Sequence, residues 1–169
     1  MNDSWMIASQ NFTDDDGSLP GVEFRNLLPS SVRSLVNYFR QHGTLTSVDA
    51  HLWHNQLQED VLIREVDDPA GLVVSGIADS FHCCFQLPLN GDSQIPVLGL
   101  FVFPDLVEID YRMGADWNPG NVDAFFRLLA HLKSMAPESI VESADCEGVP
   151  YPDEFKKALG QYTDLNKAK

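Results

Sequence analysis

The chain has 169 residues and a mass of 18.8 kDa, a length that predicts one globular domain over residues 1–169. Its 44% apolar and 21% charged residues are ordinary for a globular protein and argue against disorder or fibrous repeats. Eleven basic residues against 25 acidic ones give a net charge of −14 and a pI near 4.4. Phosphate backbones and anionic lipids repel such a chain, so nucleic acid and membrane surfaces are poor partners and a cationic partner is favoured.

The N-terminal residues 1–16 contain no basic residue and no apolar run of signal-peptide length, so they do not read as a secretory signal. No segment approaches the roughly 20 consecutive apolar residues that a membrane helix needs. Cys83 and Cys84 are adjacent, and on a strand their side chains point to opposite faces, which favours reduced thiols over a disulfide framework. We therefore expect a cytoplasmic protein.

The first helix is predicted over residues 31–42. Its apolar residues follow the spacing of one buried stripe: Val32, Leu35, Val36 and Phe39. The segment 29–31 supplies the helix start, and Gly43 is expected to end the helix in a left-handed conformation.

Residues 44–112 are predicted to form strands separated by turns. Short strands are predicted at residues 48–53, 61–66, 72–77 and 81–87, and a turn at residues 89–92. Residues 95–103 are almost continuously apolar, which predicts a central strand covered on both faces. Residues 106–113 alternate instead, with Val107, Ile109, Tyr111 and Met113 on one side and Glu108, Asp110 and Arg112 on a solvated side.

The C-terminal third is predicted to be mainly helical. Asn121 is expected to cap a helix over residues 121–135, a short strand is expected at residues 140–141, and a last helix over residues 152–162. Residues 164–169 are expected to form a frayed tail. Clustered strands between helices predict an α+β fold with a mainly antiparallel sheet.

The histidines and cysteines do not predict a metal site. His51 and His54 are three residues apart on an expected strand, where their side chains point to opposite faces. His82 and Cys84 share a face and would supply two ligands, but no second paired motif supplies the others. Packed or surface histidines are the favoured interpretation, and no metal or cofactor is predicted.

Glu108 and Asp110 share the solvated face of a strand, where two carboxylates suit a divalent cation or an acid–base pair. The alternative is a solvated strand face on which Arg112 relieves the repulsion between them. No nucleophile elbow, phosphate loop or catalytic triad accompanies the pair. The prediction is therefore a protein that is not an enzyme, with an orphan enzyme or small-ligand-binding domain using the Glu108/Asp110 face as the alternative.

Trp117 lies in the loop between this strand and the next helix, so it is either an interface anchor or a plug between sheet and helix. Trp53, at the end of another predicted strand, has the same two interpretations. Two groups of acidic residues surround these features: Asp105, Glu108, Asp110 and Asp116 in one, and Glu59, Asp60, Glu65, Asp67 and Asp68 in the other.

The strand–loop–helix stretch from Val107 to Phe126, together with the size and acidity of the chain, resembles the small α+β immunity proteins found beside bacterial polymorphic and contact-delivered toxins. The resemblance implies no catalysis and no cofactor, but a cognate toxin whose basic active site an acidic surface covers. No family motif maps onto individual residues. Charge and expected exposure alone predict the partner-binding residues as Glu108, Asp110, Asp116 and Trp117.

Overall fold

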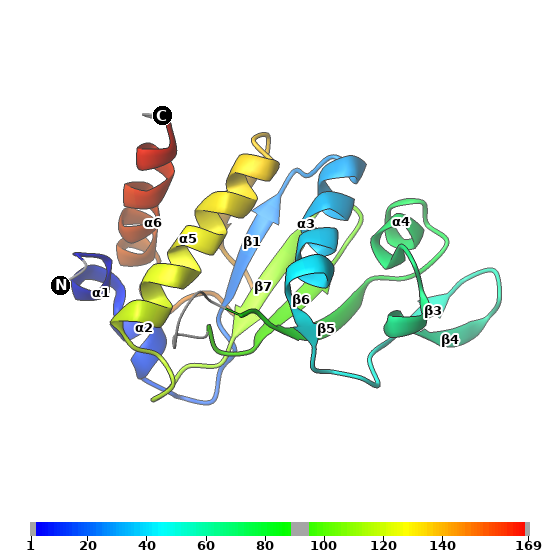
Figure 1. Cartoon of the computed structure of the whole chain (residues 1–169), viewed down its shortest axis with the longest axis horizontal. Helices are drawn as coiled ribbons and strands as arrows, with labels where there is room; N and C mark the ends of the chain where they lie inside the picture. Colours follow the sequence, from blue (N-terminus) through cyan, green and yellow to red (C-terminus); the bar gives the residue numbers. More distant parts are fainter. Residues whose placement is uncertain (1–2, 89–94, 168–169) are drawn as a thin grey trace.

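The computed structural model describes residues 3–88 and 95–167, and it has an α+β fold built on an antiparallel sheet (Figure 1). All strand pairs in the six-stranded sheet are antiparallel. From one edge to the other, its strands are β2 (Thr44–Leu45), β5 (Phe81–Gln86), β6 (Leu98–Val102), β7 (Val107–Tyr111), β1 (Gly21–Arg25) and β8 (Ile140–Ser143). A separate two-stranded hairpin consists of β3 (His51–His54) and β4 (Glu59–Leu62).

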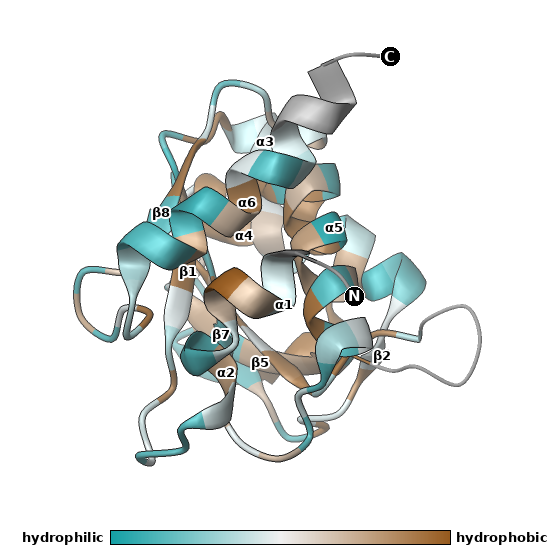
Figure 2. Ribbon diagram, turned by 90° about the vertical axis from the view of Figure 1, so that its left-hand side faces the viewer, coloured by the Kyte–Doolittle hydropathy of each residue, from teal (hydrophilic) through white to brown (hydrophobic). Residues whose placement is uncertain are grey.

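One face of the six-stranded sheet is covered by helices, which lie in front of the strands in Figure 1. The two long helices over the strands are α3 (Pro29–His42) and α5 (Pro119–Met135), and the shorter elements are α1 (Asp3–Ala8), α2 (Gln10–Thr13), the 3-10 turn η1 (Ile63–Glu65) and α4 (Pro69–Val74). The last helix, α6 (Pro152–Lys167), packs against α1 and α5. Figure 2 shows that apolar (brown) stretches of α5, α6, β5 and β7 lie in the interior of the molecule.

An aromatic cluster joins the N-terminal helices, the sheet and α5 into one core. Phe12 lies at its centre, with its ring centroid 5.1 Å from that of Tyr111, 4.7 Å from that of Trp117 and 5.9 Å from that of Phe125. The Tyr111 hydroxyl donates a 2.9 Å hydrogen bond to the backbone oxygen of Asn11. These contacts fix the end of β7 against α5 and therefore position the loop between them.

The α+β class and the mainly antiparallel sheet are confirmed, as are helices close to the predicted ranges 31–42, 121–135 and 152–162. The last helix is longer than predicted, because α6 continues to Lys167 where a frayed tail was expected from residue 164. Residues 168–169 and the predicted turn at residues 89–92 lie outside the described residues.

The strand predicted at residues 72–77 is wrong, because α4 begins at Pro69 and ends at Val74. Asp68 caps this helix by accepting a hydrogen bond from the backbone nitrogen of Gly71, and Pro69 occupies its first turn. An acidic cap followed by proline is a strong helix start, and it outweighs the β preference of the valines that follow.

Two predicted helix ends also differ in detail. Asn118, and not Asn121, caps α5 by accepting hydrogen bonds from two backbone nitrogens. Gly43 follows α3 with φ −114° and ψ 167°, which is extended and not left-handed. A side chain there would crowd the Phe39 carbonyl and Leu87, so close packing explains this glycine.

The remaining differences concern the strands. The predicted strands at residues 48–53 and 61–66 are shorter and form the hairpin β3–β4, with η1 following β4. Strand β1 was not predicted. The apolar segment 95–103 contributes only β6, whose residues Leu98, Leu100 and Val102 face the helices while Phe101 is half-buried on the other side. The expected coverage of both faces is therefore wrong.

Candidate functional site

The face of the six-stranded sheet that points away from α3 and α5 carries most of the polar side chains of the strands, and we call it the open face. Residues paired across antiparallel strands point to the same side, so the registers define a row across five strands. From β8 to β5 this row is Glu142, Glu23, Glu108, Phe101 and His82. Three carboxylates therefore stand next to one another on β8, β1 and β7.

A second row on the open face contains two glycines. Asp110 of β7 is paired with Gly21 of β1 on one side and with Gly99 of β6 on the other, and Gly99 is paired with Cys84. A Cβ atom at Gly21 would overlap the Glu108 carboxylate, and one at Gly99 would overlap the Asp110 carboxylate. The glycines therefore provide the space in which these carboxylates lie flat on the sheet.

Arg25 neutralises part of the acidic row. Its guanidinium pairs with Glu23, with Glu142 at 3.1 Å, and with Asp145 in the segment after β8 at 2.7 Å. These partners, led by the hydrogen bond to Asp145, raise the pKa of Arg25 above its ordinary value. Glu23 is only 7% exposed, and its ion pair with Arg25 satisfies this buried charge.

His82 and Asp110 form a pair above Gly99. The Nε2 atom of His82 lies 2.7 Å from Oδ2 of Asp110. This hydrogen bond raises the pKa of His82 above its ordinary value despite the opposing effect of burial. The pair therefore favours a protonated imidazole on the open face.

Glu108 carries the least well-compensated charge of the row. Desolvation raises its pKa above the ordinary value, and the charges of Glu23 and Asp110 raise it further, while His82 acts in the opposite direction. Like charges directly opposite each other destabilise a sheet. Glu108 is thus a carboxylate that gains by meeting an external cation.

An aromatic ridge borders the carboxylates. The rings of Phe101 and Phe103 are stacked with centroids 5.2 Å apart, and the His82 ring lies 5.0 Å from that of Phe101. Both phenylalanines are only partly buried. The open face therefore combines acidic groups with large apolar groups, which is the composition of many protein interfaces.

The structure brings together only two of the four predicted partner-binding residues. Glu108 and Asp110 share the open face, whereas Asp116 is exposed in the loop after β7. Trp117 is 4% exposed, and its Nε1 donates a 2.7 Å hydrogen bond to the backbone oxygen of Arg112. The expectation of an exposed anchor at Trp117 is wrong, because the aromatic cluster buries its ring between β7 and α5.

Two further expectations about this strand need correction. Arg112 does not relieve the repulsion between Glu108 and Asp110, since it pairs with Asp15 at 3.7 Å. The two acids are not fully solvated either: both are only partly exposed, and 14% of the Asp110 side chain remains exposed. Residues from neighbouring strands, which local alternation does not reveal, cover them.

Sequence reasoning missed Glu23 and Arg25, because β1 was not predicted. A signal was present, since Val22 and Phe24 alternate with these two charged residues directly after a glycine. The sequence pattern also did not predict Phe101 as a surface residue. The continuous apolar segment around Phe101 hides its alternation, which only the pairing with β5 and β7 reveals.

The arrangement offers little support for metal or thiol chemistry. Among residues 3–88 and 95–167, no group of three or more histidine, cysteine or acidic side chains is placed to hold a metal ion. His51 and His54 lie on strand β3, as predicted, three residues apart and so on opposite faces. Burial and the Asp110 charge raise the pKa of Cys84, so its thiol is a poor nucleophile.

Comparisons with family models, with curated proteins and with solved structures found no match to this chain. In the part of the chain that the structure describes, no helix combines the length and apolar character needed to cross a membrane.

Proposed function

We propose that this chain is a non-enzymatic acidic binding protein that binds and neutralises a basic protein partner, a cognate bacterial toxin, by covering its active surface with the open face. The observation that carries the proposal is the row Glu142, Glu23 and Glu108, in which three carboxylates stand side by side on a face that none of the described helices covers (Figure 1). Adjacent like charges destabilise a sheet, and a basic partner would remove that cost on binding.

The aromatic ridge supplies the anchor that this proposal needs. Phe101 and Phe103 replace Trp117 in that role, because their stacked rings remain accessible beside the acidic row. Acidic groups at the rim of such an interface accelerate association, whereas a buried aromatic anchor slows dissociation. The net charge of −14, like the local acidic row, accelerates association with a basic partner.

A cytoplasmic location belongs to the same proposal. The three cysteines are free, and Cys146 is exposed, which a reducing compartment favours. A cytoplasmic inhibitor would meet a delivered toxin where that toxin acts.

Co-expression with the product of the neighbouring gene, read out as rescue of growth, tests the proposal. Reversing two charges on the open face, Glu108→Lys with Asp110→Lys, should abolish rescue, and the milder pair Glu108→Gln with Asp110→Asn should weaken it. The matched control reverses Glu65, the last residue of η1, and Asp67, which are both exposed, and it changes the net charge equally. Full rescue by the open-face variants and loss of rescue by the control would assign binding to residues 59–68 instead.

Binding kinetics give a second measurement on the purified complex. Raising the salt concentration from 50 to 500 mM shortens the Debye length from about 14 to about 4 Å. Association should slow at least several-fold in the wild type, and less in the open-face variants, while Phe101→Ala should mainly hasten dissociation. An association rate that does not respond to salt would contradict electrostatic steering by this face.

The second candidate function is an enzyme or small-ligand-binding domain on the same face. The His82–Asp110 pair favours it, because perturbed acid–base pairs gather at active sites. Two cavities, of about 580 and 520 Å³, are not lined by His82 or Asp110. The first is lined by Arg112 and Asp116, and the second lies between α5 and α6. If His82→Gln abolished rescue without changing the affinity for the neighbouring protein, this second function would replace the first.

A further inference from the structure

Trp53 is the most exposed of the three tryptophans, and it lies on the hairpin β3–β4, which extends beyond the end of the six-stranded sheet (Figure 1). Its side chain is 39% exposed, against 4% for Trp117. The indole N–H of Trp117 has an internal acceptor, whereas that of Trp53 has none among the residues that the structure describes. Buried indoles normally satisfy this donor, so Trp53 is not a core residue that happens to reach the surface.

The backbone under Trp53 is held in place. Leu52, the preceding residue, is 1% exposed and belongs to the core. The backbone oxygen of Trp53 accepts a 3.0 Å hydrogen bond from the nitrogen of Asp79, and Asn55 donates a 2.8 Å bond to the oxygen of Ile77. The hairpin thus presents the indole on a fixed support, which lowers the entropy cost of binding a partner.

The register places a carboxylate beside the indole. Trp53 is paired with Asp60 across the two strands, so both side chains lie on the same face of the hairpin. Because the Trp53 carbonyl bonds to Asp79 and not to β4, this is the non-hydrogen-bonded type of pair, in which side chains approach most closely. Asp60 is exposed, and within residues 3–88 and 95–167 its one ion pair is a loose contact with His51, whose Nε2 lies 3.7 Å from Oδ1 of Asp60.

An indole face next to a carboxylate suits one chemical group particularly well. A guanidinium stacks on the ring by a cation–π contact and donates its N–H groups to the carboxylate at the same time. An ammonium ion lacks the planar fork that allows both contacts. We propose that Trp53 and Asp60 form a docking site for an arginine side chain of a partner protein.

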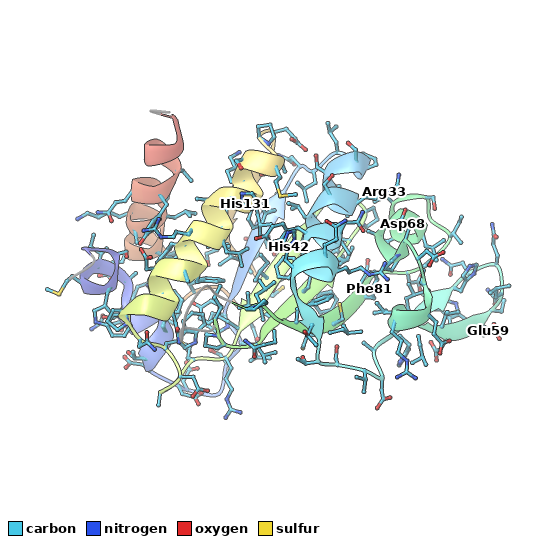
Figure 3. All side chains as sticks on the ribbon, in the orientation of Figure 1. Arg33, His42, Glu59, Asp68, Phe81 and His131 are labelled. Carbon is cyan, nitrogen blue, oxygen red and sulfur yellow. The ribbon has the colours of Figure 1, made fainter. Side chains whose placement is uncertain are left out.

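The surroundings of the hairpin favour the same cation. Glu59 lies at its outer end (Figure 3), Asp79 lies beside Trp53, and Glu65 follows the end of β4. Arg64 is the basic residue next to these acids, and its Nε atom lies 4.0 Å from Oε1 of Glu65. The site is distinct from the open face, because it belongs to the two-stranded sheet. It therefore does not depend on the function proposed for the open face.

The test is a peptide titration of the full chain at constant ionic strength, monitored by nuclear magnetic resonance. The probe is the capped peptide acetyl-Gly-Arg-Gly-amide, and the reference probes carry lysine or the uncharged arginine isostere citrulline in place of arginine. The arginine peptide should move the indole signal of Trp53 at least three-fold more per millimolar than either reference peptide. The indole signal of Trp117 should not move.

Two variants that each remove one negative charge distinguish binding at a specific site from attraction by the general negative charge of the chain. Asp60→Asn should reduce the response to arginine at least three-fold, whereas Glu59→Gln removes the same charge from the opposite face of β4 and should leave the response nearly unchanged. Both positions are exposed, so neither variant is expected to unfold the protein. Equal effects of the two variants, or equal responses to arginine and citrulline, would overturn the proposal.

Two further arms complete the design. Free L-arginine has the same net charge of +1 as the capped peptide, because its α-ammonium and α-carboxylate cancel, so it should give a response no larger than that of the peptide; a larger one would overturn the assignment to a protein side chain. The variant Glu108→Lys with Asp110→Lys should leave the titration unchanged. Failure of this proposal and failure of the proposed function are therefore distinguishable.

Discussion

The two faces of the six-stranded sheet are built by the same strands and have opposite roles. On β7, Val107, Ile109 and Tyr111 point into the helix-covered core, while Glu108 and Asp110 point to the open face. The covered face contributes stability through apolar burial. The open face instead holds like charges next to one another, which costs stability, and local conflicts of this kind are typical of functional surfaces.

The largest expected difference is between two phenylalanines on the two sides. Phe125→Ala removes a fully buried ring from the aromatic cluster and should lower the free energy of unfolding by about 3–5 kcal/mol. Phe101→Ala removes a half-buried ring from the open face and should cost clearly less than half of that. Urea denaturation of both variants gives the comparison, and equal losses would contradict the assignment of Phe101 to the open face.

Gly99 tests how the open face accommodates its carboxylates. Gly99→Val would push a side chain into the Asp110 carboxylate and the His82 ring, which should break their hydrogen bond and cost about 1–3 kcal/mol. Gly160→Ala is the matched control, because nothing lies within 4 Å of its added methyl group on α6. The free energy of unfolding of that variant should rise by up to about 1 kcal/mol, because alanine has a higher helix propensity than glycine. A fully tolerated Gly99→Val would show that the carboxylates do not need this space.

The smallest expected effect concerns Glu108 and pH. A carboxyl group whose pKa is raised in the folded state stabilises the fold in acid, and that contribution is lost as the pH rises through the raised pKa. Glu108→Gln should therefore stabilise the protein at pH 7, by about 0.5 kcal/mol, relative to the wild type. The advantage should shrink as the pH falls through the raised pKa and should be gone below the ordinary carboxyl pKa, which thermal unfolding at several pH values measures. A constant difference across this range would argue against an unfavourable charge at Glu108.

The predictions from sequence were most accurate where a periodic pattern is long. The stripe of α3 from Val32 to Phe39 and the alternation of β7 correspond to observed elements, since each follows from contacts along one segment. Predictions were less accurate for short elements, where a single residue decides between helix and strand. Asp68 and Pro69 decide in favour of α4, although the valines after them favour a strand.

The fold class, the main helices and the division of β7 into an apolar and an acidic side follow from local patterns in the sequence. The three-dimensional fold, in contrast, places Glu23 between Glu108 and Glu142, brings His82 rather than Arg112 to Asp110, and buries Trp117 while Trp53 remains exposed. The physical reason is that periodicity records which side of a strand faces the core, whereas the neighbours of a side chain depend on pairing between strands far apart in the chain.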